Sequence, residues 1–202
     1  MNGSNLISKI AMLAFGGLAF PSYALASVLT FGNTNVDRLD LAGTQSEDSF
    51  SYTASGAGWE LETTYGHPGA ALATFFNGEG SSVGNTVDIV LTGGGLFTFD
   101  SVDWKTVGIP GDDVVLEGFL SGGLVDSLTL SADSRAWVTA GGFGGPVDLL
   151  RVRITGGLGN SAMVLDNVNL TIVDHVPAPA SLTLIALGLA GIGYRRKQRK
   201  AA

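Results

Sequence analysis

The residues of this chain that could do acid–base chemistry are mainly carboxylates in two close pairs. Glu60 and Glu62 lie two positions apart, so on a β-strand their side chains would share one face. Two neighbouring carboxylates are the usual machinery of glycoside hydrolysis. Asp112 and Asp113 form the other pair, within a Pro-Gly-Asp-Asp sequence that is typical of a turn. A solvated strand face and a turn explain the two pairs without catalysis, and we favour these interpretations.

The sequence contains few residues for histidine chemistry and none for cysteine chemistry. Of the two histidines, His67 lies in a Tyr-Gly-His-Pro-Gly turn sequence and His175 lies just before the C-terminal segment. The sequence contains neither a Gly-x-Ser-x-Gly nor a His-Glu-x-x-His motif. It has no cysteine, which excludes disulfides, thiol nucleophiles and Cys-ligated zinc or iron–sulfur sites. We therefore predict a protein that is not an enzyme, with a carboxylate-dependent hydrolase as the less favoured alternative.

Aromatic side chains are the other candidates for a binding site, because exposed ring faces can pack against the apolar faces of sugars. Trp59 and Trp104 lie within predicted strands, and we expect both in the core. Trp137 lies between the sequence Ser-Ala-Asp-Ser-Arg and a Gly-rich loop, which favours an exposed ring. Trp137 is therefore the candidate ligand-binding residue, and an extracellular polysaccharide is the candidate ligand.

The distribution of charge argues against nucleic acid as a partner. The chain of 202 residues has a net charge of -7, yet five of its 11 basic residues lie in the last eight positions. Residues 27–175 hold all 18 acidic residues and only five basic ones, a net charge of -13. Such a body would repel a phosphate backbone.

The elements that must position these residues are predicted to be strands. The sequence is 45% hydrophobic, which is enough for a core, and its 30 glycines suit an all-β protein with many turns. Short runs with period two alternate with Gly, Asn, Asp and Ser across residues 27–175. We predict roughly ten short strands in an all-β, antiparallel β-sandwich domain over residues 27–175.

Two local features sharpen the predicted fold. Strands at 114–120 and 124–130 flank Ser121-Gly122-Gly123, which predicts a hairpin with a three-residue loop. In the stretch 95–107 neither alternating set of residues is purely apolar, so we expect a twist or bulge near Asp100.

The N-terminus has the three parts of a secretory signal peptide. Lys9 supplies the positive region, Ile10 to Phe20 form an apolar stretch, and Pro21 breaks it. Ala24 and Ala26 place small residues at the −3 and −1 positions, so we predict a helical signal peptide over residues 1–26 that is cleaved after Ala26. The alternative is a buried N-terminal helix.

The C-terminus forms a second signal, residues 176–202. Pro177 and Pro179 precede an uncharged apolar run at 180–194, and five of the six residues at 195–200 are basic. The run predicts a hydrophobic helix that holds the chain in the membrane, and the basic tail predicts a cytoplasmic end. An ordinary C-terminal anchor is the alternative to a sorting signal.

This arrangement resembles the sorting signal of the PEP-CTERM family of exported bacterial proteins. Val176, Pro177 and Pro179 match a Val-Pro-Glu-Pro motif, and Ala178 stands where Glu is commonest. The resemblance implies processing near the motif by an exosortase, a membrane protease-transpeptidase. It also implies a Gram-negative bacterium that makes extracellular polysaccharide, and passage from the inner membrane to the cell surface or extracellular matrix.

The body resembles a galactose-binding-like jelly roll. The resemblance rests on an early strand with a turn, a Phe-x-Phe-Asp strand, a Gly-Gly hairpin and a closing strand with Leu-Asp-Asn-Val. It implies a structural Ca²⁺ with Asp166 as its final-strand ligand and Asn33 and Asp37 in the early loop, although no carboxylate directly follows the first strand. The alternative is that Asp166 caps a turn by hydrogen bonds.

Together these features predict an exported, non-catalytic protein of the cell surface or exopolysaccharide matrix. A specific carbohydrate-binding module or adhesin is the alternative function.

Overall fold

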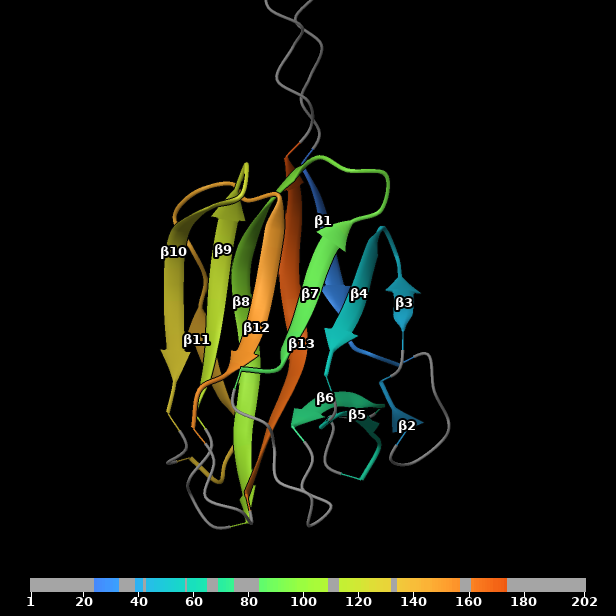
Figure 1. Cartoon of the computed structure of the whole chain (residues 1–202), viewed down its shortest axis with the longest axis vertical. Helices are drawn as coiled ribbons and strands as arrows, with labels where there is room; N and C mark the ends of the chain where they lie inside the picture. The colour runs from blue at the N-terminus through green and yellow to red at the C-terminus, as the bar shows by residue number, and fades with distance from the viewer. Residues whose placement is uncertain are drawn as a thin grey trace, which may run out of the picture.

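The computed structural model describes residues 24–32, 39–41, 43–56, 58–64, 69–74, 84–108, 113–131, 134–156 and 161–173. Within these ranges the chain forms two antiparallel sheets and no helix, so the predicted all-β sandwich is confirmed (Figure 1). None of these residues belongs to a helix that could cross a membrane. The predicted C-terminal helix and residues 1–23 of the predicted N-terminal helix lie outside the described residues, whereas Leu25 and Ala26 belong to a strand rather than a helix.

The larger sheet, sheet A, has seven strands in the order β11-β8-β13-β6-β5-β2, and β1 also pairs with β13. Its strands are β1 (Leu25–Leu29), β2 (Leu39–Asp40), β5 (Trp59–Glu62), β6 (Ala71–Thr74), β8 (Leu96–Gly108), β11 (Val138–Gly141) and β13 (Ser161–Val173). The long strands β8 and β13 form the centre of this sheet. Strand β13 pairs with β8 along one edge and with β1 and β6 along the other.

The second sheet, sheet B, has six strands in the order β10-β9-β12-β7-β4-β3. Its strands are β3 (Thr44–Glu47), β4 (Phe50–Ser55), β7 (Thr86–Leu91), β9 (Val114–Leu120), β10 (Gly123–Leu130) and β12 (Leu149–Ile154). Strand β12 illustrates how alternating apolar and polar residues place one face of the sheet in the core and the other outside. Leu150 and Val152 are buried, whereas Arg151 on the opposite face pairs with Asp88 of β7.

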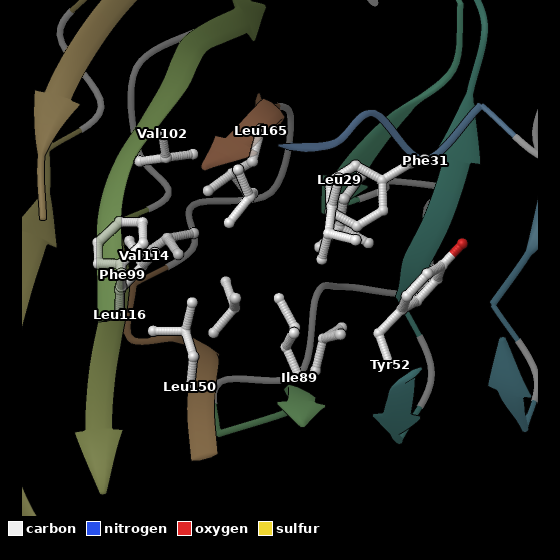
Figure 2. Packing of buried hydrophobic residues seen from close by; sticks show 14 of the residues in the cluster. Leu29, Phe31, Tyr52, Ile89, Phe99, Val102, Val114, Leu116, Leu150 and Leu165 are labelled. Atoms are coloured by element: carbon white, nitrogen blue, oxygen red, sulfur yellow. The ribbon is translucent and has the colours of Figure 1, made fainter. Parts of the chain in front are cut away.

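The core lies between the two sheets. Phe99, Val102 and Leu165 of sheet A and Leu116 and Leu150 of sheet B point into it (Figure 2). All are buried, and burial of such side chains is the main force that holds the sheets face to face. Trp59 and Trp104 belong to this core, as the sequence predicted.

The expected irregularity near Asp100 is present in the β8–β13 pair. Phe99 and Val102 both face the core, so the alternation of β8 changes phase between them. On the partner strand the register shifts between Asp166 and Asn169, and Asn167 has a φ of 46°. Asn tolerates this left-handed conformation better than most residues do. The prediction of a twist or bulge is confirmed.

The β9–β10 hairpin has a shorter loop than the sequence predicted. Ser121 and Gly122 have φ values of 52° and 80°, and Gly123 already pairs with Leu120. Two consecutive residues with positive φ make a two-residue turn, whose twist matches that of the strands. The predicted three-residue loop is therefore wrong by one residue, and β10 begins at Gly123.

Strand β1 begins before the predicted cleavage point. Ala24 directly precedes β1, and Leu25 and Ala26 pair with Ile172 and Thr171 of β13. Cleavage after Ala26 would leave Ser27–Leu29 as the paired part of this strand. The signal peptide itself stays a prediction.

The phenol of Tyr52 on β4 has an environment that predicts alkaline sensitivity. The side chain is fully buried, its ring lies 5.3 Å from that of Phe31, and its hydroxyl has no hydrogen-bond partner in the described part of the chain. Burial, assisted by the charge of Glu47, raises the pKa of Tyr52 to about 12. The same Glu47 carboxylate accepts hydrogen bonds from the backbone N–H groups of Thr30 and Phe31, at 3.0 and 2.8 Å.

We expect the protein to lose stability between about pH 10 and pH 12, because the folded state keeps the phenol protonated where the unfolded chain releases the proton. This loss amounts to about 2–3 kcal/mol from Tyr52 alone. Tyr52→Phe should remove that part of the loss and leave stability at pH 7 unchanged or up to about 1 kcal/mol higher. Urea unfolding at pH 7 and pH 11.5 measures both effects. Equal losses in the two proteins would contradict this role of Tyr52.

Candidate functional site

The candidate site is built on the outer face of sheet A, away from the core. In β5, Trp59 and Leu61 face the core, so Glu60 and Glu62 point outward. In β8 the same rule turns Asp103 and Lys105 outward, because Val102 and Trp104 are in the core. We call the following residues the outer-face cluster: Glu60, Glu62, Asp103, Lys105, Trp137 and Asp166.

Strand register brings this cluster together from distant parts of the sequence. Glu60 pairs with Ala73 of β6, Ala73 with Val164 of β13, and Val164 with Lys105 of β8. These residues form one row across four strands. In the neighbouring row Glu62 pairs with Ala71, and Asp166 pairs with Asp103. Small apolar side chains thus lie between the carboxylates of β5 and the charged residues of β8 and β13.

Three of the four carboxylates of the cluster are buried, and Asp103 is half-buried. Glu60, Glu62 and Asp166 have relative exposures of 4%, 0% and 2%. Buried charges are costly unless they are paired or hydrogen-bonded. Asp166 accepts a hydrogen bond from the backbone N–H of Asn167 at 2.7 Å, and Glu62 accepts one from the N–H of Thr64 at 2.9 Å. The expected solvated strand face for Glu60 and Glu62 is therefore wrong, although the two side chains do share a face.

Trp137 lies at the other side of the cluster, next to Lys105. The Nζ atom of Lys105 is 4.6 Å from the centre of the Trp137 ring, which is a cation–π contact. The ring also packs against the small apolar cluster of Ala71, Ala73 and Val164. Trp137 is therefore half-buried rather than fully exposed, and one part of its surface already has partners.

The pKa of Lys105 is affected both by burial and by a neighbouring negative charge. Burial lowers the pKa of the Lys105 ammonium, and the negative charge of Asp166 acts in the opposite direction without cancelling it. Asp103 is held by two donors, the hydroxyl of Thr139 at 2.5 Å and the side-chain amide of Asn167 at 2.9 Å. These contacts fix the charged groups beside Trp137 in defined positions.

The same outer face continues as a ladder of polar side chains toward the end of β13. The hydroxyls of Thr98 and Thr171 donate to the two carboxylate oxygens of Asp100, at 2.8 and 2.6 Å. The amide of Asn169 donates to the hydroxyl of Ser101 at 2.9 Å. Such a face can hydrogen-bond a polar ligand, but its own groups are already bonded to one another.

Of the three predicted calcium ligands, only Asp166 lies within the described residues. Asp166 is buried on the outer face, and its carboxylate accepts a hydrogen bond from the N–H of Asn167 at the bulge within β13. Asn33 and Asp37 lie outside the described residues. Among the residues that are described, no group of three or more carboxylate or histidine side chains is arranged to hold a metal ion. The calcium site stays a prediction.

Of the second carboxylate pair, the structure describes only Asp113, which lies beside sheet B rather than on the outer face of sheet A. Asp113 precedes β9, where its backbone oxygen accepts a hydrogen bond from the N–H of Thr155 at 2.9 Å. Asp112, His67 and His175 lie outside the described residues. Sequence reasoning missed Asp103 and Lys105, although their alternation with Val102 and Trp104 in one strand was a signal that both point outward.

The sorting signal follows directly after the described fold. Strand β13 ends at Val173, and a family model described as the PEP-CTERM protein-sorting motif matches residues 175–197. The chain carries a PEP-CTERM sorting signal. This signal indicates an exported protein that is sorted by an exosortase and is held in the membrane before processing. The four motif residues themselves, Val176 to Pro179, lie outside the described residues.

Solved structures give weaker likenesses. The family 32 carbohydrate-binding module of C. perfringens NanJ, in complex with galactose, is 16% identical over 60% of this chain and 93% of its own, with a TM-score of 0.40. A family 29 module from Piromyces equi is 8% identical over 76% of this chain and 95% of its own, with a TM-score of 0.42.

A DUF4465 family protein from Bacteroides caccae is 11% identical over 72% of this chain and 98% of its own, with a TM-score of 0.42. No curated protein sequence matches the chain.

Proposed function

We propose that this protein is a non-catalytic component of the cell surface or exopolysaccharide matrix of a Gram-negative bacterium. An exosortase-type membrane protease would detach it from the inner membrane, where its C-terminal segment holds it for a time. The observation that carries this proposal is the PEP-CTERM signal at residues 175–197. The predicted signal peptide at residues 1–26 supports it, because a chain that is sorted after export must first be exported.

The outer-face cluster supports a structural rather than a catalytic role for the carboxylates. A general acid or base must reach the proton that it transfers. Glu60, Glu62 and Asp166 are buried on a face whose floor is Ala71, Ala73 and Val164. Their burial shields these carboxylates from solvent and so from a substrate that would approach this face.

Pulse-labelling of the native bacterium followed by fractionation tests the proposal. The labelled precursor should first appear in the inner-membrane fraction. It should then move to the outer surface or the extracellular matrix as a shorter product. Stable residence of the full-length chain in the inner membrane would support an ordinary anchor and contradict sorting. Recovery from the cytoplasm would contradict export.

Carbohydrate recognition is a second candidate function, and Trp137 is the observation that favours it. The half-buried ring lies on an outer face beside the fixed side chains of Asp103 and Lys105. Sugar-binding sites combine an apolar ring surface with a few oriented polar groups. The ligand would be the extracellular polysaccharide in which the protein is deposited.

Trp137→Ala is expected to weaken binding to exopolysaccharide purified from the same bacterium by about fivefold, because an aromatic contact of this kind contributes about 1 kcal/mol. Retardation of the protein in native gels that contain the polysaccharide measures this. Phe119→Ala is the matched control, since Phe119 is also paired with a cation, Arg151 at 5.2 Å, but belongs to sheet B. Equal effects of the two changes, or no effect of either, would count against recognition at Trp137.

A further inference from the structure

We propose that the end of the sandwich where β13 terminates rests on the membrane while the sorting signal is intact, and that the tip of the β9–β10 hairpin contacts the lipid through Leu124 and Val125. This inference rests on the proposed function, because it requires the C-terminal segment to be in the membrane. It adds an interaction surface and its partner, a lipid surface.

The first argument is the length of the tether. Strand β13 ends at Val173, and the uncharged apolar run begins at residue 180. The six residues between them make seven Cα-to-Cα steps, which span at most about 25 Å when fully extended. The 13 residues of β13 alone span about 40 Å. Because the tether is shorter than the domain, the end that carries Val173 must stay close to the membrane.

The second argument is that the hairpin tip lies at the same end of the sandwich. The N–H of Ser121, in the hairpin turn, donates to the Asp148 carboxylate at 2.6 Å. The adjacent Val147 exchanges backbone hydrogen bonds with Phe97, at 2.8 and 2.9 Å. Phe97 pairs with Ile172, the residue before the last of β13. Figure 1 shows the hairpin turn and the end of β13 together at the top of the molecule.

The third argument is the exposure of apolar side chains at this tip. Leu124 is 57% exposed and Val125 is 53% exposed, directly after the turn. Leu25, another exposed large apolar residue, pairs with Ile172 and so lies at the same end in the uncleaved chain. Adjacent exposed apolar side chains at a protruding tip mark a surface that contacts another apolar phase.

The hairpin favours lipid over a second copy of the chain. The register of β10 shifts between Leu124 and Asp126, which makes Val125 a bulge on an edge strand. Bulges at edges hinder strand-to-strand association. Residues 114–130 include Glu117 and Asp126 but no Lys or Arg. The contact is therefore apolar, and we expect it to be insensitive to salt.

The absence of cysteine from the sequence allows a clean test with single labels. The full chain with Leu124→Cys is labelled with bimane and reconstituted into vesicles of phosphatidylcholine and phosphatidylethanolamine. Thr129→Cys, an exposed site five residues further along β10, is the control. Quenching by spin-labelled lipid should be at least twofold stronger at position 124 than at position 129, with a blue shift of the emission only at position 124.

Flotation of the vesicles distinguishes failure of the proposed lipid contact from failure of the proposed membrane anchor. If the protein floats and positions 124 and 129 are quenched equally, the lipid contact is wrong and the proposed sorting function stands. If the protein does not float, the membrane anchor and the contact are both wrong. Disulfide-linked dimers of Leu124→Cys in the vesicles would show that the tip meets a second copy, which also overturns the proposal. Val125→Cys repeats the measurement with Leu124 intact.

Discussion

Gly142→Ala is expected to destabilise the protein by about 4 kcal/mol or more and to lower its melting temperature by roughly 10 °C. Gly142 follows β11, and its N–H donates to the backbone oxygen of Asp100 at 2.8 Å. The N–H of the next residue, Phe143, donates to the backbone oxygen of Phe99, also at 2.8 Å. These two bonds hold the chain after β11 against β8.

A methyl group at position 142 has no room. Its Cβ atom would lie 1.8 Å from the backbone oxygen of Phe99 and 2.4 Å from its carbonyl carbon. Phe99 is a fully buried core residue, so its backbone cannot move away without disturbing the sandwich. Relief would require β11 to separate from β8, and Trp137 and Thr139 would lose their positions on the outer face.

Gly141→Ala is the matched control for this prediction. A Cβ atom at position 141 would meet nothing within 4 Å, and neither glycine requires a positive φ. We expect the control to change stability by less than about 0.5 kcal/mol. Thermal and urea unfolding of the two variants measure the difference. Similar stability of both variants would show that β11 does not pack on β8 as described.

Replacing Pro177 and Pro179 together by Ala is expected to block sorting, with at least a tenfold loss of processed protein and accumulation of precursor in the inner membrane. Pro disfavours helix in the residues before it and lacks a backbone N–H. With Ala at both positions, the helix predicted for residues 180–194 can extend toward β13. The motif would then no longer present the extended segment that a protease binds.

Ala178→Glu is the control for the sorting prediction. It places the commonest residue of the PEP-CTERM motif at the one position where this chain departs from it, and it keeps both prolines. Processing should be unchanged or faster. Immunoblots of fractionated cells measure the ratio of precursor to product. If the variant without the two prolines is processed as well as the wild type, recognition does not depend on residues 176–179.

The fold class was predictable because strand alternation is a local signal. The period-two pattern of β9 and β12 and the phase change near Asp100 can be read from neighbouring residues alone. The loop of the β9–β10 hairpin was predicted one residue too long. A two-residue turn needs a positive φ at both positions, and Ser121 adopts one although serine rarely does.

The outer-face cluster was predictable only in pieces. Parity shows that Glu60 and Glu62 share a face, but whether that face is buried depends on what covers it. The row from Glu60 to Lys105 depends on the pairing of four strands that are far apart in the sequence. Register of this kind is set by tertiary packing. The sorting signal, by contrast, is contiguous, and its three parts can be recognised without any fold.

The most direct test of sorting is the intact mass of the mature protein purified from the cell surface or matrix. We predict a chain that begins at Ser27 and ends within or beside residues 176–179, without the apolar run at 180–194 and the basic tail at 195–200. A mature protein that still contains residues 180–202 would contradict processing by an exosortase and leave the C-terminus as a permanent anchor.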